Sequence, residues 1–205
     1  MTDDAAIRAF FAVDLDAVAR CAAAEVAAAL REGADGDAVR WVRPEALHVT
    51  LRFLGDIDPA EVVGLARCVG EQLAPLEAFD LSLGSARLFP SARRPRVVAL
   101  QVAPPAPLER LAAAVERGVV AAGLPAEERP FRAHLTLGRV RRGERGPATR
   151  GLAAPEGTAC RVAETVLFRS DRGPAGARYT PLERLKLGGG GGPLRPPRGE
   201  VHDGS

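Results

Sequence analysis

The sequence predicts a mixed fold of helices and strands, built from two similar lobes that face each other. Two observations carry this prediction: one short pattern occurs twice, and helix-like and strand-like runs alternate in a similar order around each copy. The 205 residues, 46% of them hydrophobic, are enough for one sizeable core. The net charge of +2 and a pI near 8.7 argue against a strongly basic nucleic-acid platform.

The repeated pattern reads RPEALHVTL at 43–51 and RPFRAHLTL at 129–137. Each copy places Arg-Pro ahead of a histidine that is followed by a hydrophobic residue, a threonine and a leucine. The chain has only three histidines, so two matching contexts are improbable by chance. We interpret the pattern as an internal duplication with paired active-site halves.

The two motifs fall on predicted strands, at 47–53 and 133–140. Side chains two positions apart on a strand share a face. Each strand therefore presents an imidazole beside a hydroxyl: His48 with Thr50, and His134 with Thr136. Two such faces supply two proton-transfer groups and two hydroxyl donors, which suit a bound phosphate undergoing in-line displacement.

Two other interpretations compete with this one. A lone histidine on a strand is more often structural, but the duplicated context favours catalysis here. A metal site is disfavoured because neither histidine lies in a ligand-like spacing, and His202 falls in a low-complexity tail. We therefore expect no metal and no cofactor.

The remaining composition excludes further classes. The only lysine, Lys186, lies in RLKLGG, so a ligase that works through a lysyl adenylate has no evident nucleophile. Cys21, Cys68 and Cys160 lack metal-like spacing and are expected to be buried thiols in a reducing compartment. The acidic start MTDDAAIRAF does not resemble a signal peptide, and no run is apolar enough to span a membrane. A cytoplasmic location is expected.

The first half of the chain is expected to begin with a buried strand at 7–13. The elements that follow are an alanine-rich helix at about 16–31 with Asp14 as a candidate cap, a strand pair at 39–42 and 47–53 around a turn at Pro44, and a helix at 59–73 capped by Asp58.

The second half continues with strands at 79–83 and 96–102, which flank the loop LFPSARRPR. A helix at about 107–122 ends at Gly123, the motif strand at 133–140 follows, and strands at 160–170 and 177–187 come after a polar connection at 141–157. We expect one bilobal domain at 1–187 and a disordered tail at 188–205, rich in glycine, proline and arginine.

Taken in order, these segments resemble the two-histidine phosphoesterases, and within them the RNA 2′,3′-cyclic phosphodiesterases formerly called 2′-5′ RNA ligases. Besides HVTL and HLTL, the matching stretches are IRAFFAVDL, VRWVRPEALHVTLRFLGDI, RLFPSARRPRVVAL, EERPFRAHLTLGRV and ETVLFRSDRGPAGARYTPLERLKL. The resemblance implies an α+β fold of two pseudo-symmetric lobes, each an antiparallel sheet backed by helices. It places the active-site groove between the sheets.

The resemblance also implies a metal-independent hydrolysis of RNA 2′,3′-cyclic phosphate ends to 2′-phosphomonoesters. His134 would be the proton acceptor for water, His48 the proton donor to the leaving 3′-oxygen, and Thr50 and Thr136 would hold phosphate oxygens. The same groups could run the reverse step, an ATP-independent 2′-5′ ligation. The expected partner is RNA with a cyclic end, tRNA fragments among the candidates, and the protein is expected to be a monomer.

Four further residues are candidates for substrate binding. The resemblance assigns Arg139 to the phosphate, although strand parity puts it opposite His134 unless a bulge or the strand end re-aims it. Arg132 and Arg52 share the parity of the histidines, and either could steer RNA, though a solvated charge is the commoner role. Phe89 lies beside the loop arginines, a combination that stacks bases and neutralises phosphates in single-stranded RNA.

Two alternative functions stay open on sequence grounds. One is a phosphodiesterase that acts on small cyclic nucleotides or ADP-ribose 1″,2″-cyclic phosphate. The other is a non-catalytic module that binds RNA ends through its threonines and arginines.

Overall fold

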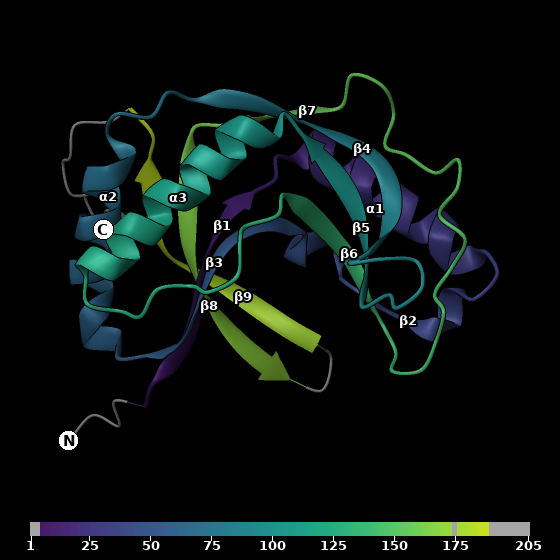
Figure 1. Ribbon diagram of the computed structural model, residues 1–205, viewed down its shortest axis with the longest axis horizontal. Coiled ribbons are helices and arrows are strands. Elements are labelled where there is room, and N and C mark those ends of the chain that lie inside the picture. The colour runs from purple at the N-terminus through teal and green to yellow at the C-terminus, as the bar shows by residue number, and fades with distance from the viewer. Residues whose placement is uncertain (1–4, 174–175, 189–205) are drawn as a thin grey trace, which may run out of the picture.

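The computed structural model describes residues 5–173 and 176–188, so nearly all of the tail expected at 188–205, with His202, lies outside the described residues. Two antiparallel sheets form the molecule (Figure 1). Sheet A has the order β3 (His48–Ile57), β1 (Ile7–Asp14), β8 (Glu164–Gly173) and β9 (Gly176–Lys186). Sheet B has the order β2 (Val39–Trp41), β6 (His134–Val140), β5 (Val97–Ala103), β4 (Phe79–Phe89) and β7 (Ala159–Val162).

The helices back the sheets in a crossed arrangement. Helix α1 (Ala17–Glu32) follows a strand of sheet A but packs on sheet B. Helices α2 (Val62–Leu73) and α3 (Pro105–Ala121) pack against each other and on β9 and β3 of sheet A. Figure 1 shows the α2–α3 pair on one side of the molecule and α1 on the other. The predicted α+β class is confirmed. Sheet A is covered by α2 and α3, and sheet B is covered by α1, which follows a strand of sheet A.

Local sequence explains where the helices begin and end. Buried small and branched residues of α1 recur along one face, at Ala19, Ala23, Val26, Ala27 and Leu30. The cap predicted at Asp14 is wrong, since the Asp16 carboxylate accepts the N–H of Ala19 at 2.8 Å. The cap predicted at Asp58 is confirmed at η3 (Pro59–Glu61), a 3₁₀ turn that leads into α2. Gly123 has φ +92°, as expected after α3.

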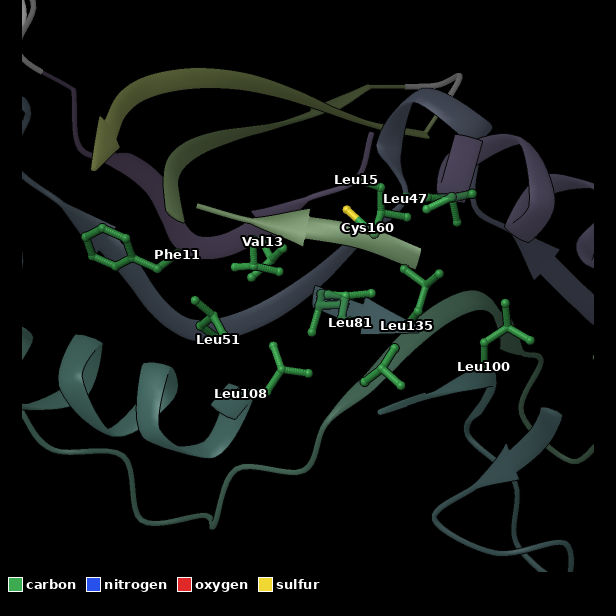
Figure 2. Packing of buried hydrophobic residues seen from close by; sticks show 14 of the residues in the cluster. Phe11, Val13, Leu15, Leu47, Leu51, Leu81, Leu100, Leu108, Leu135 and Cys160 are labelled. Carbon is green, nitrogen blue, oxygen red and sulfur yellow. The ribbon is translucent and has the colours of Figure 1, made fainter. Parts of the chain in front are cut away.

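One hydrophobic cluster joins both sheets and the helices, and Figure 2 shows side chains of both sheets packed together with Leu108 of α3. The motif strands enter it by alternation: Val49 and Leu51 of β3, and Leu135 and Leu137 of β6, are buried. The threonines and histidines between them therefore point the other way. The core thus fixes which face of each sheet carries the chemistry.

Three expectations about local structure are wrong. The strands at 39–42 and 47–53 do not pair, because η1 (Gly36–Ala38) and η2 (Pro44–Ala46) turn the chain and β2 pairs with β6 instead. The strand expected at 160–170 is two strands in different sheets, divided at Ala163. Of the three cysteines expected to be buried, Cys160 is buried, Cys68 is partly exposed and Cys21 is exposed.

Within the described residues, no helix is both long and apolar enough to cross a membrane.

Candidate active site

A bulge follows the His-x-Thr motif at the same place in both repeats. In sheet A, Phe11 pairs with Arg52 and the next residue, Ala12, pairs with Thr50, so Leu51 is the extra residue. In sheet B, Val98 pairs with Gly138 and Ala99 with Thr136, so Leu137 is the extra residue. A bulge reverses the alternation of side chains beyond it. The repeat therefore extends to backbone geometry as well as to sequence.

The bulges decide which later residues share the histidine face. Arg139 follows the bulge of β6 and returns to the face of Thr136, because their partners Val97 and Ala99 lie two apart on β5. The parity argument required such a bulge. By the same geometry Phe53 shares the face of Thr50 in β3 and is about half exposed. The positive charge of Arg139 contributes to lowering the pKa of His48, so the histidine faces of the two sheets lie near each other.

Arg52 does not share the face of His48, and this part of the sequence interpretation is wrong. The Leu51 bulge turns Arg52 toward α3, where its guanidinium donates to Glu116 and to the carbonyl of Pro125, both at 2.5 Å. Glu127 lies 3.7 Å away. The side chain is only 10% exposed. Arg52 ties β3 to the segment that leads into His134, and it is neither a solvated charge nor a group on the histidine face.

A second arginine holds the segment before His48. Arg20 of α1 donates to the carbonyls of Pro44 and Leu47, each at 3.1 Å, and pairs with Asp14 at 2.6 Å. The segment before each His-x-Thr motif is therefore held by an arginine from another element, Arg20 before His48 and Arg52 before His134. Neither arrangement could be predicted from sequence patterns, because the contacts join distant segments.

The two imidazoles are oriented in the same way. Nδ1 of His48 lies 2.8 Å from the carbonyl of Ala46, and Nδ1 of His134 lies 2.7 Å from the carbonyl of Arg132. A carbonyl only accepts, so each Nδ1 carries a proton and donates it. Each neutral imidazole then presents an unprotonated Nε2. That of His48 accepts from the Thr50 hydroxyl at 2.9 Å.

Aromatic side chains enclose His48. The rings of Phe10 and Tyr179 have their centroids 4.8 and 5.1 Å from it, and Phe168 lies 6.5 Å away. This burial lowers the pKa of His48 from 6.5 to about 4, and the charges of Arg20 and Arg139 act in the same direction. The hydrogen bond to Ala46 and the Asp14 carboxylate oppose the shift. At neutral pH the free protein holds His48 uncharged.

A cavity of about 160 Å³ adjoins His48, lined by residues of β1, α1, η2, β8 and β9. A larger cavity of about 390 Å³ lies near the end of α2 and the start of α3, with none of the candidate site residues in its wall. We therefore place the site by the histidines and their partners and not by cavity size.

His134 has a different environment. The ring of Phe89 stacks on its imidazole with centroids 4.9 Å apart and planes 13° apart. The guanidinium carbon of Arg132 lies 5.7 Å from the centre of the same Phe89 ring. Two of the residues predicted to bind substrate are thus brought beside His134.

Sequence reasoning missed the enclosure of His48. Phe10, Phe168 and Tyr179 are not among the candidate site residues that the sequence analysis names. The chain has few aromatic residues, only 4% of the total, so their gathering at the two histidines is itself informative. The strand IRAFFAVD hides the signal, because it is apolar on both faces.

Among residues 5–173 and 176–188, no group of three or more His, Cys, Asp or Glu side chains is arranged to hold a metal ion.

A family model described as LigT like Phosphoesterase matches residues 13–99 and again residues 100–179. The chain belongs to the LigT-like phosphoesterase family. The two matches each contain one His-x-Thr motif, which confirms the internal duplication. The predicted resemblance is confirmed with them.

Relatives of similar length support the assignment. A protein of Methanothermobacter thermautotrophicus named RNA 2′,3′-cyclic phosphodiesterase is 35% identical over 189 residues, which cover 88% of this chain and 99% of that protein. A protein of the same name from Thermus thermophilus is 34% identical over 191 residues, covering 89% and 91%. The crystal structure of E. coli LigT in apo form superimposes with a TM-score of 0.74 at 29% identity, covering 89% and 98%.

Proposed function

We propose that this LigT-like phosphoesterase hydrolyses RNA 2′,3′-cyclic phosphate ends to 2′-phosphomonoesters. The observation that carries the proposal is the pair of His-x-Thr faces, each with its imidazole fixed through Nδ1, so that Nε2 is the nitrogen left for proton transfer. In the free protein, Nε2 of His48 accepts only from the Thr50 hydroxyl of its own motif, within the part of the chain that the structure describes. The names of relatives that align over nearly the whole chain support the choice of an RNA cyclic phosphate.

In this proposal the two histidines divide the proton transfers. Water attacks the cyclic phosphorus and gives a proton to Nε2 of His134, so that a new P–O bond forms. The P–O3′ bond breaks as protonated His48 gives its proton to the 3′-oxygen. Thr50, Thr136 and Arg139 hold the non-bridging oxygens. The phosphate remains on the 2′-oxygen, and the protons balance over the cycle.

The low pKa of His48 makes its proton depend on the substrate. Free His48 is neutral at neutral pH. A phosphate anion next to the imidazole favours its charged form and raises the pKa again. His48 thus takes up its proton as the anionic substrate binds, and it becomes an acid only when there is a leaving group to protonate.

No step consumes a nucleoside triphosphate. With a 5′-hydroxyl in place of water, the same groups would form a 2′-5′ phosphodiester and release the 3′-hydroxyl. The expected partner is therefore an RNA end, and tRNA fragments are candidate substrates.

Comparative kinetics tests the proposal. The substrates are an RNA oligomer with a 2′,3′-cyclic phosphate, adenosine 2′,3′-cyclic phosphate and ADP-ribose 1″,2″-cyclic phosphate, and kcat/KM should be highest for the RNA. A preference for the ADP-ribose compound would assign a different substrate. Absence of hydrolysis of all three at every pH would leave an RNA-end binding module.

Mutation of the histidines tests the mechanism. His48→Ala and His134→Ala should each lower kcat by about 100- to 10,000-fold, the usual effect of losing a general acid or base. The double variant should lose much less than the product of the single losses, because both groups act in one step. A variant that keeps full activity would remove that histidine from the mechanism.

A further inference from the structure

Two arginines lie directly opposite each other beside the candidate active site. Arg40 of the edge strand β2 is the Cα partner of Arg139 of β6. Directly opposed residues of an antiparallel pair point to the same face, and like charges in that position destabilise the sheet. Since Arg139 shares the face of His134 and Thr136, Arg40 lies on the histidine face too.

Neither arginine has a counter-charge in the part of the chain that the structure describes. Both side chains are exposed, and neither forms an ion pair or a side-chain hydrogen bond with residues 5–173 or 176–188. By contrast, Arg20, Arg52 and Arg184 each bind a carboxylate. Two unpaired like charges at adjacent positions are arranged to share an anion from outside the chain.

The position of this pair relative to the motif indicates which anion. The β5 partners of Thr136 and Arg139, Ala99 and Val97, lie two residues apart, which is about 7 Å along the strand. Arg40 lies one strand farther out, at the edge of sheet B. An anion held there is displaced from the reacting phosphate by roughly one nucleotide of chain.

We propose that Arg40, together with Arg139, forms a second phosphate subsite, which binds the 5′-phosphodiester of the nucleotide that carries the cyclic phosphate. The inference rests on the proposed function and adds the reason for preferring RNA over a mononucleotide. A mononucleoside 2′,3′-cyclic phosphate lacks this phosphodiester, whereas every RNA end has it. Arg139 faces both phosphates, and Arg40 faces only the second.

The test compares two substrates that differ in this group: adenosine 2′,3′-cyclic phosphate, and the dinucleotide ApA that ends in a 2′,3′-cyclic phosphate. Arg40→Ala should lower kcat/KM for the dinucleotide about tenfold or more beyond any loss for the mononucleotide, the effect of one charge-assisted contact. The salt dependence for the dinucleotide should weaken by about 0.7 in the slope of log kcat/KM against log salt. Arg40→Lys should recover part of the loss.

Arg67→Ala is the matched control, because Arg67 is an exposed arginine on α2, which packs on sheet A, and forms no ion pair within the described chain. It changes net charge equally and should affect both substrates by less than twofold. The melting temperature of Arg40→Ala should equal or slightly exceed that of the wild type, since like-charge repulsion is relieved.

Equal effects of Arg40→Ala on both substrates would overturn the subsite and leave the proposed function standing. A wild-type protein that hydrolyses neither substrate would overturn the proposed function and the subsite together.

Discussion

Protonation of His48 should oppose folding, and the structure sets the size of the effect. An exposed histidine in the unfolded chain binds a proton near pH 6.5, whereas burial lowers the pKa of His48 in the folded protein to about 4. The folded protein keeps its full unfolding free energy above pH 6.5. It loses this contribution progressively as pH falls from 6.5 through 4, because the unfolded chain takes up the proton first. The difference between the two pKa values corresponds to about 3 kcal/mol of unfolding free energy in total, and about 2 kcal/mol of this is lost between pH 7 and 5.

Urea denaturation of the wild type and of His48→Gln at pH 7 and pH 5 measures this effect. The wild type should lose about 2 kcal/mol more than the variant between the two pH values, which is a difference of about 1 M in the shift of the midpoint. Carboxyl groups common to both proteins cancel in the comparison. Equal losses in the two proteins would refute the argument that the aromatic enclosure keeps His48 neutral.

Three further predictions follow from the same geometry. Because His48 must be protonated to act as the acid, its ionisation sets the alkaline limb of kcat/KM against pH, which should lie near pH 4 for the free protein; the corresponding limb of kcat should lie higher because bound phosphate favours the charged form, and pH-rate profiles separate the two. Arg52→Ala should cost about 2 to 3 kcal/mol of unfolding free energy because Glu116 is left unpaired, whereas Arg161→Ala, at an exposed pair, should cost less than 1. Gly138→Ala should cost about 1 to 3 kcal/mol in thermal unfolding, because its Cβ would overlap Val39.

The repeat made the two His-x-Thr faces of the candidate site predictable. His48 and His134 could be paired from sequence because each motif combines a turn, a strand and alternation, all of which are local properties. The crossed packing of α1 and the pairing of β2 with β6 could not be predicted in this way, because they depend on contacts between distant segments. Sequence patterns report the periodicity of an element and leave its partner open.

Bulges account for the error at Arg52. Simple alternation places Arg52 with His48 and removes Arg139 from His134, and one extra residue in each strand reverses both assignments. Both copies of the motif are followed by a bulge at the same position, so Phe53 of the first repeat corresponds to Arg139 of the second. The two residues therefore occupy equivalent positions on the histidine faces of the two sheets.

Phosphorus NMR of a single reaction tests the two-histidine mechanism most directly. The substrate is an RNA that ends in a 2′,3′-cyclic phosphate, and the reaction is run with and without EDTA. If two imidazoles supply both proton transfers, the rates with and without EDTA should be equal. The product should be a 2′-phosphomonoester, because protonated His48 releases the 3′-oxygen. A 3′-phosphate product would contradict the proposed roles of His48 and His134. Loss of activity in EDTA with recovery on adding a divalent ion would contradict the mechanism itself.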